Sequence, residues 1–178
     1  LALNAEELSE IEAELARADA PLLSVGYNRR FAPLTLTLKN FIAQRTEPLY
    51  AHYRVNAGFL PLNHWSHDPE QGGGRIIGEA CHFIDLLTFL IGAVPVSVSA
   101  AALADQAKYR QDNVQLTFRY ADGSIGTVAY LANGNKNFPK ERIEVFSSGK
   151  IGVLEDFRSL ALVSENERKT SRSVLRQD

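Results

Sequence analysis

The sequence has a single cysteine, Cys81, no methionine, and a formal net charge of only −2. One cysteine excludes an internal disulfide framework and any zinc site built on paired cysteines. With 19 Lys and Arg against 21 Asp and Glu, the chain lacks the basic excess that nucleic acids or anionic membranes attract. No apolar run approaches the roughly 18 residues that span a bilayer, and no signal peptide is visible. These absences predict a cytoplasmic protein with no nucleic-acid or membrane partner.

The ends of the sequence are unlike those of a complete chain. It opens on Leu1, enters a helical pattern almost at once, and stops at Asp178 with no terminating signal. We therefore expect a piece of a longer protein, with disorder at both ends as the alternative. The 178 residues, 45% of them hydrophobic, are enough for one domain of ordinary size.

The first part of the chain has the pattern of half a doubly wound unit. Asn4 followed by Glu7 resembles a capping box, and apolar residues at helical spacing predict a helix over residues 5–18. Residues 22–26 form a short apolar run ending in glycine, which is typical of a buried parallel strand. The other strands of such a sheet are missing from the sequence. A second helix is expected over residues 33–45.

The middle of the chain combines strands with one strong helix. Residues 49–57 predict a strand rich in aromatic and β-branched residues, and residues 94–103 alternate as another. Between them lies a connection over residues 58–75. A loop of this length inside a compact domain is usually functional or disordered, and we expect Trp65 to order it. Residues 76–91 form the clearest helix, closed by a glycine.

An Asp-Gly pair at residues 122–123 predicts a hairpin between two strands. If these two residues are the turn, Tyr120 faces Ile125 and one face of the hairpin is apolar. Val128 and Tyr130 then lie on the other, more polar face. Apolar side chains beside polar ones fit an interface better than a bare surface, so we expect self-association through this face.

Three further strands are expected at residues 142–146, 151–154 and 160–163, followed by a polar tail over residues 164–178 that we expect to fray. Several antiparallel strands after a helix-rich start indicate the α+β class. The predicted fold is one broad, largely antiparallel β-sheet with helices packed on one face.

The residues most able to carry chemistry surround the start of the helix at 76–91. Three glycines at 72–74 precede it, and glycines there let backbone N–H groups approach an oxygen-rich ligand. Glu79, His82 and Asp85 follow at steps of three along one stripe. The helix N-terminus favours the neutral histidine that a general base requires, whereas the two carboxylates favour the charged form. The alternative is a half-buried structural histidine behind a simple glycine turn.

Two weaker patterns lie elsewhere. His64 and His67 have an H-x-x-H spacing, which alone is weak evidence for zinc, and we expect no metal site. Asn28, Arg29 and Arg30 follow the first predicted strand, where doubly wound sheets bind ligands. Two interpretations of the arginines stay open: an anchor for a phosphate or carboxylate, or surface ion pairs. No Ser-His-Asp, P-loop or Gly-x-Gly-x-x-Gly pattern is present.

Taken together, four segments make the chain resemble the Gfo/Idh/MocA family of NAD(P)-dependent oxidoreductases. They are Gly26-Tyr27-Asn28-Arg29-Arg30-Phe31, the block from Asn63 through the three glycines to Glu79-x-x-His82-Phe83-Ile84-Asp85, the hairpin around Asp122-Gly123, and the run from Lys140 to Phe146. Their order and spacing cover nearly the whole chain. The segment Gly-Gly-Gly-Arg-Ile-Ile-Gly-Glu is similar to that of a branch of the family acting on sugars or nucleotide sugars.

The resemblance implies a division of the chain. Family members begin with a Rossmann domain that holds the Gly-rich dinucleotide loop and closes with a Glu-Lys-Pro motif, and both are absent here. Residues 1–30 would be the last helix and strand of that domain. Residues 31–178 would be a substrate-binding and oligomerisation domain, similar to the C-terminal domain of glyceraldehyde-3-phosphate dehydrogenase. The cofactor of the parent would be NAD or NADP.

The resemblance also implies roles for single residues. His82 matches the family's histidine and Glu79 is the second catalytic candidate, but Gly78 stands where the family commonly has an aspartate. The implied reaction moves a hydride between a sugar carbinol carbon and nicotinamide, while His82 handles the hydroxyl proton. The substrate would be held by Asn63, Arg75 and Lys140, and the cofactor by Asn28 and Arg29.

The resemblance finally implies partners. The parent would bind a sugar or nucleotide sugar and form a homo-oligomer through its β-sheet face. The isolated piece lacks the cofactor half of the site, so we expect it to be inactive. The alternative function is a non-catalytic sugar-binding or assembly module, and measurable NAD(H) affinity of the piece would count against it.

Overall fold

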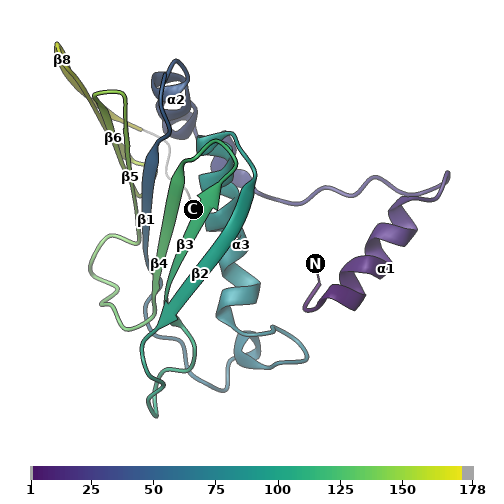
Figure 1. Cartoon of the computed structure of the whole chain (residues 1–178). Helices are drawn as coiled ribbons and strands as arrows, with labels where there is room; N and C mark the ends of the chain where they lie inside the picture. The colour runs from purple at the N-terminus through teal and green to yellow at the C-terminus, as the bar shows by residue number, and fades with distance from the viewer. Residues whose placement is uncertain (1, 174–178) are drawn as a thin grey trace.

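A computed structural model describes residues 2–173 of the chain (Figure 1). Its helices are α1 (Ala5–Leu15), α2 (Pro33–Ile42) and α3 (Arg75–Ile91), with two short 3-10 helices, η1 (Asn28–Phe31) and η2 (Trp65–His67). Its strands are β1 (Tyr50–Asn56), β2 (Pro95–Ala102), β3 (Asn113–Tyr120), β4 (Ile125–Leu131), β5 (Glu141–Ser147), β6 (Lys150–Glu155), β7 (Ser159–Ser164) and β8 (Glu167–Arg172). No helix within this range is long and apolar enough to cross a bilayer.

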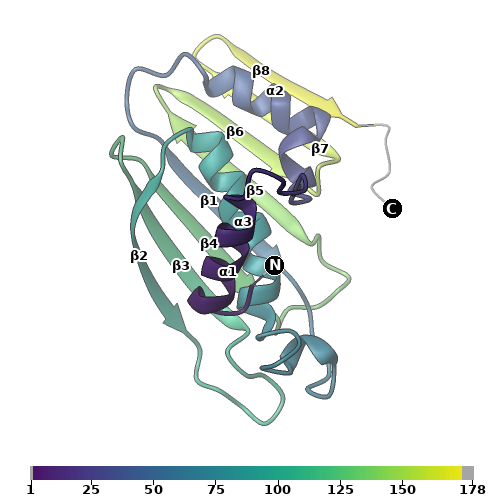
Figure 2. The ribbon, with the colours of Figure 1, turned by 90° about the vertical axis from the view of Figure 1, so that its right-hand side faces the viewer.

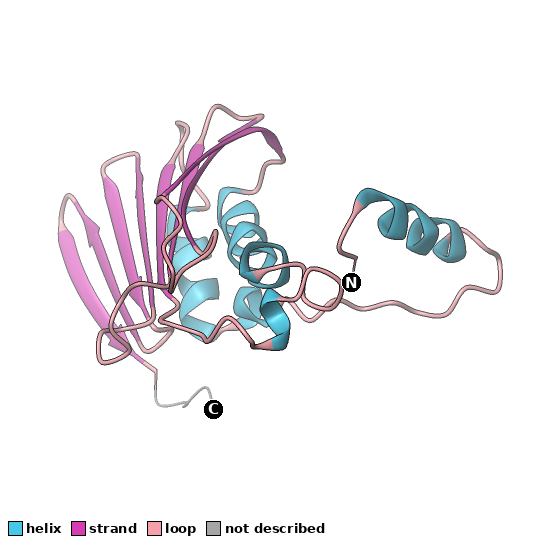
Figure 3. Cartoon of the chain, turned by 90° about the horizontal axis from the view of Figure 1, so that it is seen from below, coloured by secondary structure: helices cyan, strands magenta, loops and turns pink. Residues whose placement is uncertain are grey.

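The strands of the described range join one eight-stranded sheet in the order β2-β3-β4-β1-β5-β6-β7-β8. Neighbouring strands are antiparallel except β1 and β4, which run parallel near the centre. α2 and α3 lie on one face of the sheet, and the described chain puts no helix on the other (Figures 2 and 3). The predicted α+β class, with a broad, largely antiparallel sheet and helices on one face, is confirmed.

The core lies between α3 and the centre of the sheet. Phe83, Leu87 and Leu90 recur at helical spacing on α3 and are buried. The ring of Phe83 meets that of Tyr53 on β1 edge-on, with 5.2 Å between centroids. Burying each such side chain contributes roughly 1.5–3 kcal/mol. The helix ends at Gly92, whose φ of +77° is a left-handed conformation that glycine adopts without strain, so the predicted helix is confirmed to within one residue.

The hairpin of β3 and β4 differs from its predicted register by one residue. Arg119, not the tyrosine after it, lies opposite Ile125, because the turn holds three residues and its last, Gly123, takes a φ of +86°. A shift of one residue moves side chains to the opposite face of the sheet. Val128 and Tyr130 are therefore buried on the helix-covered face, and the predicted interface at these two residues is wrong.

The N-terminal segment holds one confirmed and one wrong prediction. The predicted cap forms, because Asn4 Oδ1 accepts the backbone N–H of Glu7 at 2.9 Å, although α1 is shorter than predicted. Residues 22–26 form no strand, and Leu22 is 97% exposed. A parallel strand needs a neighbour for its backbone hydrogen bonds, and this segment runs apart from the sheet (Figure 1). The division of the chain after residue 30 stays a prediction.

The polar tail is a strand where fraying was predicted. β8 pairs antiparallel with β7, with Ser164 opposite Glu167 across a two-residue turn. Backbone pairing needs no apolar side chain, and charged residues suit an exposed edge strand. The prediction is therefore wrong for residues 165–173, while residues 174–178 lie outside the described range.

Candidate functional site

His82 lies midway along α3, beside a hollow that α3 shares with the start of α1. The ring of Tyr27 meets the imidazole edge-on, with 5.6 Å between ring centroids. Nδ1 of His82 is buried and has no hydrogen-bond partner within the described chain. The hollow has a volume of about 610 Å³, and Gly78 and Cys81 also line it. The imidazole is therefore half-buried at the edge of a cavity of the size that small ligands occupy.

The surroundings of His82 keep its pKa below the usual value. Burial favours the neutral imidazole most, and the positive charge of Arg29 adds to it. Asp85, Glu141 and Glu79 act in the opposite direction without outweighing these two. The sequence alone did not show whether the neutral or the charged imidazole is favoured, and burial is the largest effect that favours the neutral form. A neutral imidazole can accept a proton, as a general base must.

Arg29 and Glu141 form an ion pair beneath α3. Nε and Nη2 of Arg29 donate to the two carboxylate oxygens of Glu141 at 2.9 and 2.8 Å, and the Tyr53 hydroxyl donates to the same carboxylate. The guanidinium also lies over the ring of Phe83, 5.0 Å from its centroid. Of the two interpretations of this arginine, ion pairing holds, although in the interior rather than at the surface. Glu141 could not be recognised as the partner of Arg29 from the sequence, because it stands in a short run of charged residues.

A second ion pair joins η1 to α3. Nε of Arg30 donates to Asp85 Oδ2 at 2.6 Å, and Nη2 donates to the other carboxylate oxygen. η1 is thus fastened to β5 through Arg29 and to α3 through Arg30. Because Tyr27 directly precedes η1, these two pairs set the position of its ring against His82.

Glu79 and Arg75 form another polar group at the start of α3. Nε of Arg75 donates to Glu79 at 3.0 Å, and Nη1 donates to the carbonyl of Gly58 at 2.8 Å. The Tyr130 hydroxyl donates to the second oxygen of Glu79 at 2.7 Å. Arg75 is only 6% exposed, so it anchors the segment after β1 to α3. Glu79 shares α3 with His82, but no hydrogen bond joins the two side chains within the described residues.

The backbone N–H groups of the three glycines before α3 form hydrogen bonds within their own loop. The N–H groups of Gly72 and Gly73 each donate to the Asp68 carbonyl at 2.9 Å, and that of Gly74 donates to the Ser66 carbonyl at 3.0 Å. A Cβ at Gly72 would lie 2.4 Å from the Ser66 backbone, which leaves no room for a side chain. The glycine-turn interpretation therefore holds for these N–H groups, which do not face a ligand.

Trp65 does not order the connection before α3. Its side chain is 62% exposed, and the buried side chain at this place is its neighbour Ser66. The prediction is wrong because the polar turn closes through hydrogen bonds, among them a 2.9 Å contact between His64 Nδ1 and Ser66 Oγ. In the part of the chain that the structure describes, no group of three His, Cys, Asp or Glu side chains could hold a metal ion.

Three predicted site residues lie at the surface. Asn63 in the connection, Asn28 at the start of η1 and Lys140 before β5 are exposed. Lys140 is placed at the carboxyl end of β1, because its carbonyl accepts the backbone N–H of Asn56 at 2.7 Å. Asn28 adjoins the tyrosine that touches His82. No contact brings Asn63 to the histidine within the described chain.

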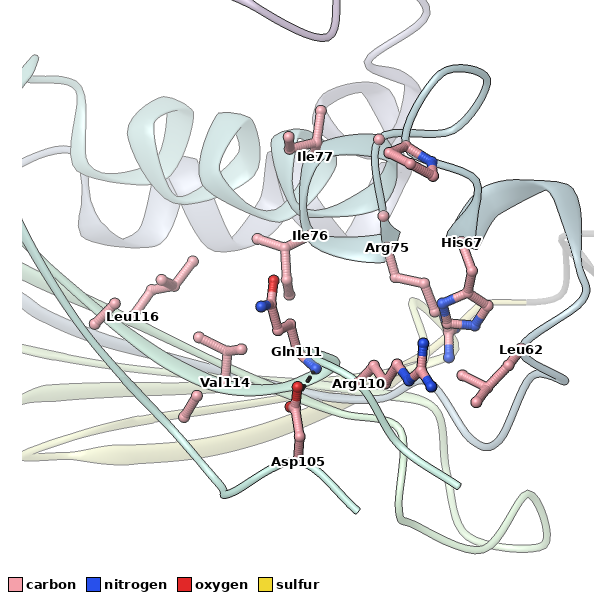
Figure 4. Close-up of a pocket in the computed structure, with 15 residues that line it drawn as sticks. Leu62, His67, Arg75, Ile76, Ile77, Asp105, Arg110, Gln111, Val114 and Leu116 are labelled. Atoms are coloured by element: carbon pink, nitrogen blue, oxygen red, sulfur yellow. Dashed lines mark hydrogen bonds between the residues drawn. The ribbon is translucent and has the colours of Figure 1, made fainter. Parts of the chain in front are cut away.

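A second hollow, of about 840 Å³, lies between the first turn of α3 and strands β2 and β3 (Figure 4). Its lining includes Ile76, Ile77, Val114, Leu116, His67 and Arg75. Ile77 also lines the hollow beside His82, so the two adjoin. Among the predicted site residues only Arg75 reaches it, because no local motif marks a cavity whose walls come from distant elements.

Comparison with known proteins connects this geometry to a family. Residues 38–159 match the family described as the GFO/IDH/MocA C-terminal domain. The chain belongs to this family. The matched segment includes β1, all of α3 with Glu79 and His82, and Glu141 at the start of β5. The resemblance that the sequence motifs indicated is therefore confirmed.

Named relatives are dehydrogenases of about twice this length. Inositol 2-dehydrogenase 2 of Paenarthrobacter aurescens (strain TC1) is 27% identical over 177 residues, which is 92% of this chain and 50% of that protein. UDP-N-acetylglucosamine 3-dehydrogenase GnnA of Acidithiobacillus ferrooxidans has a TM-score of 0.75 at 20% identity, over 98% of this chain and 54% of its own. Levoglucosan dehydrogenase, in complex with NADH and levoglucosan, has a TM-score of 0.75 at 19% identity, over 97% of this chain and 52% of its own. The chain spans about half the length of these relatives, and the two structures share its fold.

Proposed function

We propose that the chain is the C-terminal half of an NAD(P)-dependent oxidoreductase that acts on a hydroxyl group of a sugar or nucleotide sugar. In this role it supplies the substrate pocket and the residue that transfers the proton. The observation that carries the proposal is His82, a half-buried histidine with a lowered pKa at the edge of a cavity. Relatives named for inositol, levoglucosan and a nucleotide sugar support this substrate class.

The substrate hydroxyl lies against His82 in this proposal. Oxidation of a carbinol carbon releases a hydride and a proton, and a nicotinamide cofactor, when bound, would supply the acceptor for the hydride. The imidazole takes the hydroxyl proton and later releases it to solvent. Burial and Arg29 keep the ring neutral before the transfer, and the negative charges of Asp85 and Glu141 stabilise the imidazolium that forms.

The residues of this chain fit one side of a nicotinamide site. No Gly-x-Gly-x-x-Gly loop is present to hold the phosphates, and the guanidinium of Arg29 is already paired. Tyr27 and Gly78 line the hollow beside His82, and Asn28 is exposed next to it. Because position 78 carries no side chain, this wall stays open to a flat ring. These residues would contact the nicotinamide, and the rest of the cofactor would need a second domain.

Three further side chains are proposed to face the substrate, and a fourth, Arg75, is proposed to support them. The Glu79 carboxylate is about one-third exposed and is held by two hydrogen-bond donors, so it can accept from a sugar hydroxyl in a fixed direction. Among residues 2–173, the exposed side chains of Lys140 and Asn63 form no hydrogen bond or ion pair. Arg75 is buried, and we assign it the support of Glu79 and of the segment after β1.

Reduction of NAD⁺ or NADP⁺ by candidate sugars tests the proposed function directly. The full-length oxidoreductase, in which this chain follows a dinucleotide-binding domain, is expected to reduce NAD⁺ or NADP⁺ with a sugar or nucleotide sugar. Residues 1–178 alone are expected to reduce neither. The substrate panel includes myo-inositol, levoglucosan and UDP-N-acetylglucosamine. A full-length protein that binds these compounds and reduces neither nucleotide contradicts the proposal and favours the non-catalytic sugar-binding module.

We also propose that the chain forms homo-oligomers through the open face of its sheet, at a place other than the one predicted from the sequence. Ile125, Tyr50 and Phe146 lie side by side across β4, β1 and β5, and they are 39%, 43% and 41% exposed. The rings of Tyr50 and Phe146 are 6.3 Å apart between centroids. A contiguous apolar row on a helix-free sheet face is closer to an interface than to a bare surface.

Two charges in this row are expected to separate the copies. Sedimentation equilibrium should give twice the 19.7 kDa chain mass for the unchanged chain and a single mass for Ile125→Lys with Phe146→Lys. Both positions are partly exposed, so the fold should tolerate them. Val96→Lys on the edge strand β2 is the matched control, since that valine is 63% exposed and lies outside the row. A monomeric unchanged chain at tens of micromolar would refute the interface.

A further inference from the structure

The loop between β4 and β5 is fastened to the carboxyl end of β1. The side-chain amide of Asn56 donates to the carbonyls of Asn135 and Phe138 at 2.8 and 3.1 Å, and its backbone N–H donates to that of Lys140 at 2.7 Å. Asn56 is only 6% exposed. The guanidinium of Arg54 lies over the Phe138 ring, 4.8 Å from its centroid. These contacts give the loop a single path over the end of the strand.

Two glycines allow this close approach. A Cβ at Gly134 would lie 1.9 Å from Asn56 Oδ1, so the loop backbone rests directly on the buried amide. Gly58 has a φ of +70°, and a Cβ there would lie 2.7 Å from Lys136 Cγ. The aliphatic part of Lys136 therefore packs on the Gly58 backbone. A loop held in this way presents its side chains with little ordering left to be done when a ligand binds.

Three positive charges gather at this loop and the end of β1, and that of Lys140 also acts on the neighbouring carboxylate of Glu141. Lys136, Lys140 and Arg54 have no ion-pair partner among residues 2–173. Nη2 of Arg54 is buried and lacks a hydrogen-bond partner in the same range. The two carboxylates of the proposed site, Glu141 and Glu79, are each already bonded to one arginine and one tyrosine. The charge of the loop is therefore available to a ligand.

The loop also reaches the start of α3, although neither lysine lines the hollow beside His82. Lys140 directly precedes the buried glutamate whose ion pair lies beneath α3. The carbonyl of Gly58, on which Lys136 packs, accepts a hydrogen bond from Arg75. Arg75 is the first residue of α3 and lies two turns before His82. Both lysines thus stand where β1, β5 and the start of α3 come together.

We propose that Lys136 and Lys140 bind an anionic substituent, a carboxylate or a phosphate group, on the sugar whose hydroxyl faces His82. The inference rests on the proposed function and narrows its substrate class to charged sugars. Lys136 was not among the residues that the sequence marked for substrate. Asn56 acts as a positioning residue, because it holds the loop and does not itself face the ligand.

Three sugars that differ in charge test the proposal on residues 1–178. Glucose 6-phosphate, glucuronate and neutral glucose are titrated into the ¹⁵N-labelled chain at fixed ionic strength, and amide shifts of residues 134–140 are followed. A charge-assisted hydrogen bond corresponds to roughly tenfold or more in affinity. We therefore expect at least about a tenfold preference for one anionic sugar over glucose. Which anionic sugar binds better distinguishes a phosphate from a carboxylate ligand.

Paired variants separate the loop from general surface charge. Lys136→Gln with Lys140→Gln is expected to abolish the preference, and Lys169→Gln on the edge strand β8 is expected to keep it. Equal affinity for all three sugars, no binding of either anionic sugar, or an equal loss with Lys169→Gln overturns the proposal. If glucose binds as tightly as the two anionic sugars, the lysine site is ruled out, but oxidation of a neutral sugar remains possible. The lysine proposal and the proposed function therefore fail on different results.

Discussion

In the proposed full-length oxidoreductase, replacing His82 with alanine is expected to lower kcat by roughly 10²–10⁴-fold, the usual contribution of a positioned general base. Burial lowers the pKa of this imidazole at the edge of the hollow, which favours the neutral form that accepts a proton. Cofactor affinity should stay the same, because the histidine forms only one edge of the cavity. Steady-state kinetics and a separate NAD(H) titration measure the two effects.

The matched control is His52→Gln. His52 is also half-buried with a lowered pKa, but it lies on the open face of the sheet, where its Nδ1 contacts Thr127 Oγ1 at 2.8 Å. This variant should keep kcat within about threefold of the unchanged enzyme. A His82 variant with unchanged kcat would show that the histidine is structural, as the alternative interpretation of the sequence allowed.

The second large effect concerns the ion pair beneath α3. Arg29→Ala leaves the carboxylate of Glu141 buried without its cation, and breaking such a pair typically costs about 3–5 kcal/mol. The side chains of Arg29 and Glu141 are only 18% and 8% exposed, so solvent replaces little of the lost interaction. Urea unfolding of residues 1–178 measures the change in the free energy of unfolding.

Arg142→Ala provides the comparison, because Arg142 pairs with Glu144 and Glu155 on the open face with 38% of its side chain exposed. Its loss should cost at most about 1 kcal/mol. Arg29→Ala combined with Glu141→Gln should recover part of the larger loss, since no charge is then left buried. If Arg29→Ala costs no more than Arg142→Ala, the pair does not hold η1 in place.

The same pair gives stability a dependence on acid. Burial alone would raise the pKa of Glu141, but the hydrogen bonds and charge of Arg29 and the Tyr53 hydroxyl outweigh it and lower the pKa below its usual 4.5. The folded state therefore binds this proton less readily than the unfolded chain. The contribution is complete above pH 4.5 and is lost as the pH falls through the lowered value.

The sequence predicted most elements of the fold because their periodicity and end signals are local. The helix at α3 and its closing glycine depend only on residues within a few turns of each other. The register of the hairpin could not be predicted from local signals alone, because a two-residue and a three-residue turn are both compatible with Asp122 and Gly123. The geometry of the turn, not the residue types, decided which face Val128 and Tyr130 occupy.

The site was predictable where one helix carries it and unpredictable where partners come from distant segments. Glu79, His82 and Asp85 lie on one helix, and their spacing indicated them. The partner of Arg29 is 112 residues away in sequence, so nothing local distinguished an internal ion pair from an anion site. The same holds for Lys136, whose position depends on contacts between its loop and β1.

The pH dependence of kcat/KM for the proposed full-length enzyme tests most directly whether a neutral His82 accepts the substrate proton. Activity is expected to rise with pH through a midpoint below 6.5, because burial and Arg29 lower the pKa of this histidine. This acidic limb is expected to disappear in His82→Ala, whose residual activity no longer depends on that group. An acidic limb with the same midpoint in both enzymes would show that a group other than His82 is the base.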